Sequence, residues 1–313
     1  MNKTEIKKYL KYLNFDKFYP VTYKKCEICS SKKTKLIQRK ISWNNNKFGI
    51  LPVHVCTNCG FVFQNPRFSK KFYMEYYKKA YRDITLKTQI PPNDYLKDQK
   101  FRGQKLFNFL KPFLPKKGNM LDVGSSVGLM MLPFLNKKWN CIGNDPIKGF
   151  ADYGKNTLKL PVEWLQSEDM ILKKKSLDLI IIMGSLEHVH DVNVVMKKCK
   201  DAIKKGGILV LEARGDPIGF SKNFFNQSHH RYFFKNTMEL VMIKYGWKPF
   251  ITTRYPITGP SRVNTQFCIG RFEGKKISNN FSKIISSGKR ETYLDIYYKL
   301  KYHDFLEKKK INN

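Results

Sequence analysis

The sequence predicts an α/β protein built on a mostly parallel sheet whose last strand is antiparallel, preceded by a small module stapled by cysteines. Three observations predict this arrangement. From residue 119 onward, short apolar runs alternate with turns and helical segments, which is typical of a parallel sheet covered by helices on both faces. The connection over residues 255–264 is too short for a parallel crossover, so the strand after it should be antiparallel to the strand before it. Two Cys-x-x-Cys pairs precede this region.

Three segments are expected before the sheet. Residues 1–20 have the pattern of a short basic amphipathic helix. Residues 21–66 contain both cysteine pairs but too little apolar sequence for an independent core, so this module needs a staple. Residues 67–118 are helical and rich in Tyr and Lys, and Pro91-Pro92 should divide this connector into two helices.

Residues 119–274 are expected to form the sheet domain, and residues 275–313 a basic tail with one helical stretch over 293–306. Gly206 and Gly207 should stop the third helix of the sheet domain. Seven strands are expected, at residues 120–123, 139–143, 162–165, 177–183, 208–212, 247–253 and 265–272. Helices should fill residues 129–136, 148–157, 192–204 and 236–245.

The composition indicates a folded chain with a strong positive charge. An apolar fraction of 42%, with 23 Phe and 17 Tyr among 313 residues, excludes a wholly disordered protein. Lys and Arg number 59 against 25 acidic residues, giving a net charge of +34. This charge suits a polyanionic partner such as nucleic acid, anionic lipid or a phosphorylated substrate. Because only 10 of the 59 are Arg, which binds phosphate bidentately, a compositional bias toward Lys is the alternative.

The sequence predicts a cytosolic protein. Residues 1–15 alternate Lys with apolar residues and contain no stretch of signal-peptide type. The longest apolar run, Leu179–Met183, is far shorter than the ~20 residues of a membrane helix, so no membrane span is expected. In a reducing compartment, paired cysteines indicate metal ligands or a redox motif.

Four cysteines have the spacing of a tetrahedral metal site: Cys26, Cys29, Cys56 and Cys59. Each pair can place two thiolates on one tight turn, and four thiolates suit structural Zn²⁺ while leaving no open position for catalysis. A redox motif would need only one pair, within a βαβ pattern that this segment lacks. Replacement of one thiolate by His54 stays an alternative.

A glycine turn follows the first predicted strand of the sheet domain. Gly124-Ser-Ser-Val-Gly128 lies between that strand and a helix, where the backbone can approach a ligand closely and the helix N-terminus favours a negative group. Asp145 ends the next strand, 21 residues after Gly124, where a nucleoside ribose would offer its hydroxyls. The sequence therefore predicts a nucleoside-containing ligand at this edge of the sheet.

At these residues the sequence resembles the class I S-adenosylmethionine-dependent methyltransferases, which have a Rossmann-like seven-stranded sheet with an antiparallel last strand. The likeness lies in residues 121–128, 143–146, 177–189 and 206–212. The cysteine pairs, residues 73–81 and residues 230–234 are similar to a subgroup that carries a zinc-binding module and acts in sugar and polysaccharide pathways. The resemblance implies an enzyme that uses S-adenosylmethionine and contains structural Zn²⁺.

The resemblance also assigns residues to the methionine end of the cofactor. Gly124 and Gly128 would shape this end of the site, and Asp122 would support it. Ser126 stands where the family usually has a third glycine. Its Cβ should narrow the room for the methionine moiety.

Other residues are assigned to the adenosine end. Asp145 would accept hydrogen bonds from the ribose hydroxyls, and Gly184 would end the fourth strand beneath the cofactor. Glu168 or Asp169 would contact the adenine edge, with a solvated turn residue as the alternative for each.

Catalytic candidates follow the fourth and fifth strands. His188 is the expected base, because imidazole titrates near neutrality, and Glu187 is its neighbour. The alternative is that both only cap and orient the following helix. His230, with His229 and Tyr232, forms a second candidate cluster, for which packing is the alternative.

The expected function is methyl transfer to a small-molecule acceptor, a nucleotide-linked sugar or another glycan precursor, whose diphosphate the positive charge would help to hold. One alternative is an RNA or protein methyltransferase that grips a polyanion. That function predicts lysines gathered on one face, whereas Lys173–Lys175 and Lys308–Lys310 are far apart in the chain, so nucleic acid is not favoured. The other alternative is a non-catalytic, zinc-stapled interaction protein. The oligomeric state has no signature in the sequence.

Overall fold

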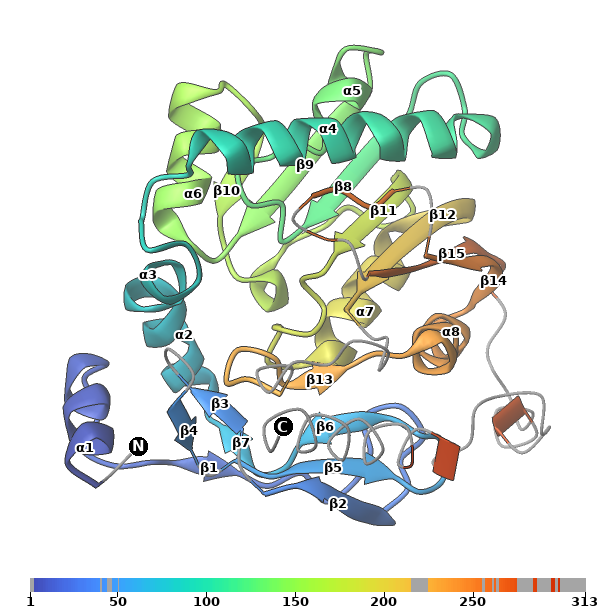
Figure 1. Cartoon of the computed structure of the whole chain (residues 1–313). Helices are drawn as coiled ribbons and strands as arrows, with labels where there is room; N and C mark the ends of the chain where they lie inside the picture. The colour runs from blue at the N-terminus through green and yellow to red at the C-terminus, as the bar shows by residue number, and fades with distance from the viewer. Residues whose placement is uncertain are drawn as a thin grey trace, which may run out of the picture.

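The computed structural model describes residues 3–39, 41–43, 47–49, 51–214, 225–254, 257–260, 262 and 265–274, with residues 284–285, 294–295 and 298 beyond them. Apart from those last few positions, the predicted tail over 275–313 and its helix at 293–306 lie outside the described residues. Figure 1 shows a large sheet with helices on both sides above a smaller β-structure, and the helices α2 and α3 connect the two parts at one side.

The large sheet has seven strands in the order β10-β9-β8-β11-β12-β15-β14. All are parallel except β15, which is antiparallel to both of its neighbours. This order and the antiparallel strand confirm the predicted fold class. The strands are β8 (Asn119–Val123), β9 (Asn140–Asp145), β10 (Val162–Trp164), β11 (Leu177–Met183), β12 (Ile203–Ala213), β14 (Trp247–Thr253) and β15 (Gln266–Phe272).

The apolar run of β11 forms the centre of the sheet because both of its faces are covered. Leu179 and Ile181 belong to one hydrophobic cluster and Ile180 and Ile182 to another, as the alternation of side chains in a strand requires. The first cluster packs under α4 (Asn93–Leu110), α5 (Leu132–Leu135) and α6 (Lys148–Asp152), and the second under α7 (Val192–Ala202) and α8 (Lys235–Lys244). Residues Tyr153–Thr157 continue α6 as a π-helix.

Two predicted helix boundaries are wrong, the end of one helix and the start of another. The helix expected to reach residue 204 ends at Ala202, and β12 begins at Ile203, so Gly206 lies inside a strand. The register between β11 and β12 shifts there, and Gly206 has a φ of +82°, which a bulge of this kind favours. The helix expected over residues 129–136 is helical only from Leu132 to Leu135, after a run of turns that begins beyond Val123.

The cysteine module is completed by a strand from the sheet domain. Its four-stranded sheet has the order β13-β6-β5-β2, and β13 (Arg231–Tyr232) comes from residues that follow β12. The other members are β2 (Thr34–Gln38), β5 (Val53–Cys56) and β6 (Val62–Gln64). Two small ladders flank this sheet: β1 (Pro20–Val21) with β7 (Arg67–Phe68), and β3 (Ile41–Trp43) with β4 (Lys47–Gly49).

The connector contains three helices rather than the two predicted. They are α2 (Lys70–Lys79), α3 (Tyr81–Leu86) and α4, after the terminal helix α1 (Lys3–Tyr12). Ser69 caps α2 by accepting from the Phe72 N–H, and α3 is followed by Lys87, whose φ is +56°. The sequence has no strong breaker at Ala80, so the division between α2 and α3 was missed.

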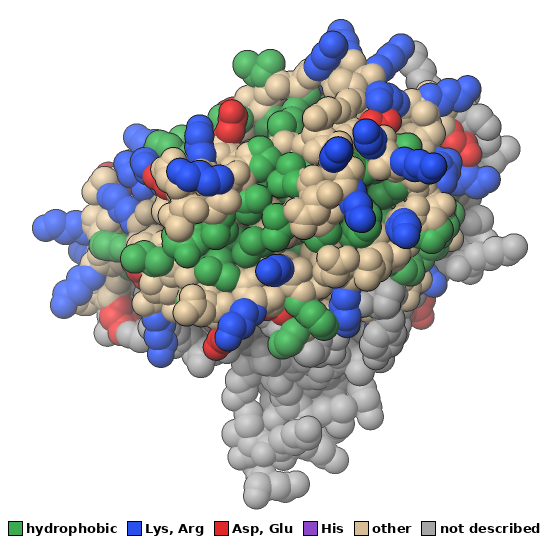
Figure 2. Space-filling view, turned by 90° about the horizontal axis from the view of Figure 1, so that it is seen from above, with side chains coloured by type: hydrophobic (Ala, Val, Ile, Leu, Met, Phe, Trp, Pro, Cys, Tyr) green, Lys and Arg blue, Asp and Glu red, His purple; other side chains and the backbone are tan. Residues whose placement is uncertain are grey.

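None of the helices in the described part of the chain combines the length and the apolarity that spanning a bilayer takes. Figure 2 shows that Lys and Arg side chains are spread over the face seen from above, with apolar side chains between them. This agrees with the scattered lysines of the sequence, because the cations on this face do not form one patch.

Candidate active site

A cavity of about 580 Å³ lies at the carboxyl ends of β8, β9 and β11 and beneath α2, α3 and α4. Ligands bind at this edge in open α/β sheets. Predicted site residues that line the cavity are Asp122, Gly124, Asp145, Gly184 and His188. A second hollow of about 510 Å³ beside α8 and β14 contains none of the predicted site residues.

The turn after β8 is held against the end of β9. The Ser126 N–H donates to Asp145 Oδ2 over 2.8 Å, and the Ile147 N–H donates to Asp145 Oδ1 over 2.9 Å. Burial raises the pKa of Asp145, while the Arg82 charge and these two N–H groups oppose the rise. The carboxylate is therefore fixed by backbone donors at the wall of the cavity, where a ligand hydroxyl can still donate to it.

Ser126 adopts the conformation that a glycine would favour. Its φ is +56°, and its hydroxyl is 2.7 Å from the hydroxyl of Tyr95 on α4. The side chain thus points toward the helix above the turn. Tyr95 lines the cavity and was not predicted, because its link to the turn is a contact between distant segments.

The glycines of the turn have different surroundings. Gly124, with a φ of +74°, lines the cavity, and a Cβ there would collide with Ser185. Gly128, with a φ of +85°, is not among the residues described at the cavity wall; a Cβ there would lie 2.5 Å from Val162 Cγ2. Gly128 therefore serves the packing of the turn on β10, whereas the resemblance had assigned it to the cofactor.

Asp122 is a buried carboxyl beneath the cavity. It is 1% exposed, and its Oδ2 has no hydrogen-bond partner among the described residues. Burial, followed by the Asp145 charge, raises its pKa to about 8. The raised pKa favours the protonated form of Asp122, in which the carboxyl can donate a hydrogen bond to a ligand atom.

The acid that reaches the cavity after β10 is Glu168, not Asp169. Asp169 Oδ1 is 3.4 Å from Lys70 Nζ, and half of the Asp169 side chain is exposed. Glu168 lines the cavity, and its Oε1 accepts from the N–H groups of His190 (2.6 Å) and Asp191 (3.1 Å). Glu168 therefore holds the loop after β11, and of the two acids named from the sequence it is the one that lines the cavity.

The histidines after β11 and β12 also differ from prediction. His188 and His229 line the cavity, and their ring centroids are 4.6 Å apart. His230 is wholly buried and is not among the residues that line the cavity. Its ring packs against that of Tyr73, with the ring centroids 3.8 Å apart. His229 rather than His230 is thus the histidine of this segment that can touch a ligand. His230 directly precedes β13, and its ring lies against Tyr73 of α2, with Nδ1 3.2 Å from the Val189 carbonyl.

Hydrogen bonds fix the tautomers of the two cavity histidines. His188 Nδ1 is 2.9 Å from the Ser228 carbonyl, which only accepts, so Nδ1 carries the proton and Nε2 has a free lone pair. Asn226 Oδ1 accepts from the Ser228 and His229 N–H groups, which leaves Asn226 Nδ2 to donate to His229 Nδ1 over 3.1 Å. The proton of His229 is therefore on Nε2.

Glu187, His188 and His229 bring their polar atoms within 4.8 Å of one another. Glu187 Oε1 accepts from the Arg214 N–H over 2.9 Å, and its buried Oε2 has no partner among the described residues. Burial, with the charges of Arg262, Arg214 and Arg82, lowers the pKa of His188 to about 3. His188 is neutral at physiological pH and can accept a proton, although the low pKa makes it a weak base.

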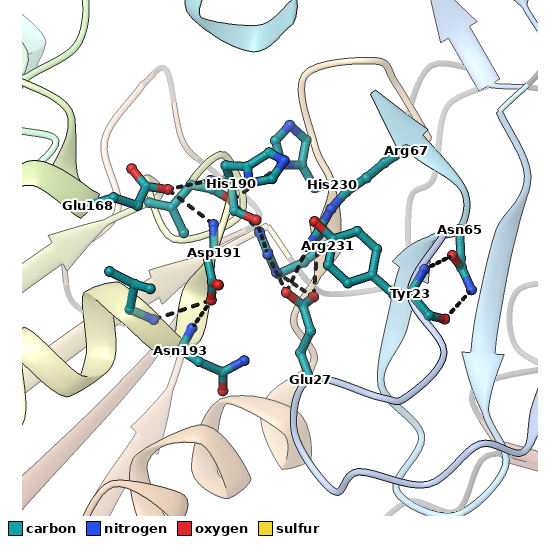
Figure 3. Close-up of polar contacts among 12 residues, drawn as sticks. Tyr23, Glu27, Asn65, Arg67, Glu168, His190, Asp191, Asn193, His230 and Arg231 are labelled. Carbon is teal, nitrogen blue, oxygen red and sulfur yellow. Dashed lines mark hydrogen bonds and ion pairs between the residues drawn. The ribbon is translucent and has the colours of Figure 1, made fainter. Parts of the chain in front are cut away.

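A buried ion cluster ties the cysteine module to the loop after β11. Glu27, between two of the cysteines, accepts from Arg67 (2.9 Å) and Arg231 (2.5 Å). Arg231 also donates to the carbonyls of Val189 and His190. Figure 3 shows the Glu27 carboxylate facing both guanidinium groups, with His190 and Asp191 beyond Arg231. Burial opposes the charge of Glu27, but the two arginines lower its pKa to about 2.

The four cysteines predicted as metal ligands come together. The Sγ atoms of Cys26 and Cys59 are 3.7 Å apart, those of Cys29 and Cys56 are 3.5 Å apart, and all four lie within 4.8 Å of one another. Four thiolates around Zn²⁺, at ~2.3 Å each, would be ~3.8 Å apart. The arrangement fits a tetrahedral ion, and His54 is not part of this group.

Comparisons with known proteins identify the domain that contains most of the large sheet. Residues 95–248 match the family model described as a methyltransferase domain. Ubiquinone biosynthesis O-methyltransferases are similar: that of Pelagibacter ubique is 29% identical over 122 residues, 37% of this chain and 50% of that protein. That of Nitrobacter winogradskyi is 31% identical over 97 residues, 29% of this chain and 36% of that protein. The chain thus spans half or less of the length of these two relatives.

Solved structures of methyltransferases resemble this chain at lower sequence identity than the relatives above. The 1,6-didemethyltoxoflavin-N1-methyltransferase of Burkholderia thailandensis has 13% identity and a TM-score of 0.44, covering 57% of this chain and 81% of that one. A possible histamine N-methyltransferase of Thermotoga maritima has 18% identity and the same TM-score, covering 57% and 92%. The strand order and the family match, rather than these scores, confirm the predicted class I methyltransferase domain, which is the domain of an enzyme.

Proposed function

We propose that this chain, whose residues 95–248 form a methyltransferase domain, transfers a methyl group from S-adenosylmethionine to a small-molecule acceptor. The observation that carries the proposal is the cavity at the carboxyl ends of β8, β9 and β11, with Asp145 and the Gly124 turn at its wall. A volume of about 580 Å³ is within the range of small-ligand sites, and α2 to α4 cover it. Such enclosure favours a small acceptor over a polymer.

The residues present fit the cofactor. Asp145 would accept from the ribose hydroxyls, and the absence of a Cβ at Gly124 lets the backbone approach the methionine moiety. Asp122 Oδ2, which has no hydrogen-bond partner among the described residues, would donate to the same moiety. When bound, the cofactor supplies a methyl group on a positively charged sulfur that is already a good leaving group. The protein then needs only to align the acceptor and remove its proton.

His188 would take that proton. The Ser228 carbonyl holds its ring through Nδ1–H, and Nε2 is the atom that accepts a proton from an acceptor hydroxyl. Tyr77, whose hydroxyl is 3.1 Å from His188 Nδ1, fixes the ring from α2. His229, with a proton on Nε2, would donate a hydrogen bond to the acceptor. The tautomer of His229 thus supports proton transfer better than shared metal binding by Glu187, His188 and His229.

A nucleotide-linked sugar or glycan precursor is the acceptor that we propose from the sequence. The curated relatives are named for ubiquinone biosynthesis and give this acceptor no support. Support comes from the cations at the cavity, Arg82, Arg214 and Arg262.

We further propose that the four cysteines bind one structural Zn²⁺. The support is the convergence of all four Sγ atoms in a module whose own apolar core is small. Replacing Cys56 and Cys59 by Ser should lower the zinc content of the purified chain by about one ion and unfold the module. Cys141→Ser, a change at a buried cysteine outside the group, is the control. Equal zinc content in all three proteins would contradict the site.

Transfer of label from S-adenosyl-[methyl-³H]methionine tests the function. With a fractionated cell extract as the source of acceptors, the wild-type chain should label the small-molecule fraction. His188→Gln should lower this labelling by about 10²-fold or more, the usual contribution of a general base, without changing the affinity for S-adenosylhomocysteine.

The other fractions test the alternatives. Label confined to RNA or protein, with a steep fall on adding salt, would support a polyanion methyltransferase instead. No label in any fraction, together with no binding of the cofactor, would support a non-catalytic protein.

A further inference from the structure

We propose that Arg214 and Arg262 form a binding site for an anionic group of the acceptor, a phosphate or a carboxylate, at the end of the cavity that holds His188 and His229. The inference rests on the proposed function, because it assigns the anionic group to the methyl acceptor.

The first guanidinium of the proposed site belongs to Arg214. Arg214 follows β12 at the carboxyl edge of the sheet and lines the cavity. Its backbone N–H donates to Glu187 Oε1, which places the residue beside the two histidines. The Arg214 side chain makes no ion pair or hydrogen bond with the described residues. Such a cation at a cavity wall is free to bind an anion with two parallel hydrogen bonds.

The second guanidinium of the proposed site, that of Arg262, shares a single carboxylate with another arginine. Arg262 lies over Gly184 at the end of β11, and its nitrogen is 3.5 Å from Glu212 Oε1. Glu212 also binds Arg102 through its other oxygen. One buried carboxylate therefore serves two cations. The 3.5 Å separation is long for a charge-assisted bond, so Arg262 retains donors for a ligand.

The charges of Arg214 and Arg262 repel each other, and the carboxylates of Glu187 and Glu212 offset part of this repulsion. The Arg262 charge is the main reason why the pKa of Arg214 is lowered, with burial second. Like charges held in a partly desolvated site cost free energy that an anion placed between them recovers. The cost is consistent with a site built for an anionic ligand rather than for packing.

An anion at this site would also act on the base. Arg262, Arg214 and Arg82 disfavour the protonated form of His188, and the first two disfavour that of His229. An anionic acceptor would offset this field and make His188 a stronger proton acceptor when the acceptor is bound. Glu187, Tyr77 and the Ser228 carbonyl also face His188 and are present in both states.

Calorimetric titration tests the site with defined probes. Pyrophosphate and malonate are titrated separately into the full chain saturated with S-adenosylhomocysteine. We expect binding of at least one probe, weakened tenfold or more by Arg214→Gln and by Arg262→Gln. The probe that binds more tightly distinguishes a phosphate from a carboxylate. Arg271→Gln, a change at an exposed arginine of β15, should leave the affinity unchanged.

Both arginine variants should keep the fold, so a change in probe affinity reports on the anion site. The Arg214 side chain has no hydrogen bond or ion pair with the described residues to lose, and Glu212 keeps Arg102 when Arg262 is replaced, so both variants should fold. Unchanged probe affinity in both variants, or no probe binding to the wild-type chain, overturns the proposal. Weaker binding of S-adenosylhomocysteine, with unchanged binding of methylthioadenosine, would assign the two arginines to the cofactor carboxylate and overturn it too. Failure of the wild-type chain to bind S-adenosylhomocysteine would instead refute the proposed function.

Discussion

His188 and His230 are neutral side chains at physiological pH because the fold buries them. The pKa of His188 is lowered to about 3 by burial, with the Arg262, Arg214 and Arg82 charges adding to the shift. Burial also holds the pKa of His230 well below its ordinary value, with the charges of Arg67 and Arg231 adding to the effect. Neither group takes up a proton in the folded chain under mildly acidic conditions, whereas both do in the unfolded chain.

The free energy of unfolding should therefore fall as the pH falls. Below an unfolded pKa of about 6.5, each of these histidines binds a proton only in the unfolded state, so each lowers stability by up to about 1.4 kcal/mol per pH unit until its folded pKa is reached. Urea unfolding between about pH 7 and about pH 5 measures this slope. In His230→Gln, the slope of the unfolding free energy against pH should decrease by the amount that corresponds to about one bound proton. A slope that is the same as that of the wild-type chain would contradict the assignment.

Single residues show what a sequence can and cannot predict about the site. Gly124 and Asp145, which line the cavity, could be named from the sequence because a turn between strand and helix and an acid at the end of the next strand are local patterns. Arg214 and Arg262 were missed because each reaches the cavity from a loop whose course depends on the whole fold. No spacing in the sequence relates them to His188.

At the scale of elements, the strand β13 joins the two parts of the molecule. It pairs with β6 of the cysteine module, and its Arg231 joins the module's Glu27 to the carbonyls of Val189 and His190. The loop that carries His188 is thus held from the module side. The sequence could not predict this, because a two-residue strand has no periodicity and its partner lies far away in the chain.

Replacing Glu27 by Gln should loosen this loop without blocking the cofactor site. Breaking a buried ion pair costs about 3–5 kcal/mol, so the melting temperature should fall while the chain stays folded. Backbone amide hydrogen exchange should increase in residues 187–190, and the affinity for S-adenosylhomocysteine should change little. Glu75→Gln, which removes only a partly exposed ion pair with Lys79, is the control. Unchanged exchange in residues 187–190 would refute a positioning role for Glu27.

Other elements follow from local rules, and their errors have local causes. The central strand β11 was predicted within its observed bounds because an uninterrupted apolar run is a strong signal. The start of β12 was placed too late, since two glycines were taken as a helix stop when they form a bulge inside the strand. The antiparallel direction of β15 was predicted from the resemblance and from the short connection before this strand.

At the scale of the whole molecule, the charge of +34 is divided between two settings. Most lysines are spread over the surface, as Figure 2 shows for one face, and this distribution fits a compositional bias better than a nucleic-acid interface. The few arginines are placed differently, because six of the ten are at the cavity or in the ion clusters beside it: Arg67, Arg82, Arg102, Arg214, Arg231 and Arg262. Whether the positive charge serves an anionic partner therefore depends on which ligand the cavity binds. The cytosolic location stays a prediction.

Equilibrium binding of S-adenosylhomocysteine tests the central claim most directly. The wild-type chain should bind one molecule, and Asp145→Asn should weaken the affinity at least tenfold because the ribose hydroxyls lose a charged acceptor, worth about 1.5–3 kcal/mol. Asp152→Asn, at an exposed ion pair with Lys148, should leave the affinity unchanged. Binding that is equally tight in the wild-type chain and in Asp145→Asn would contradict the ribose site, and no binding to the wild-type chain would contradict the methyltransferase itself.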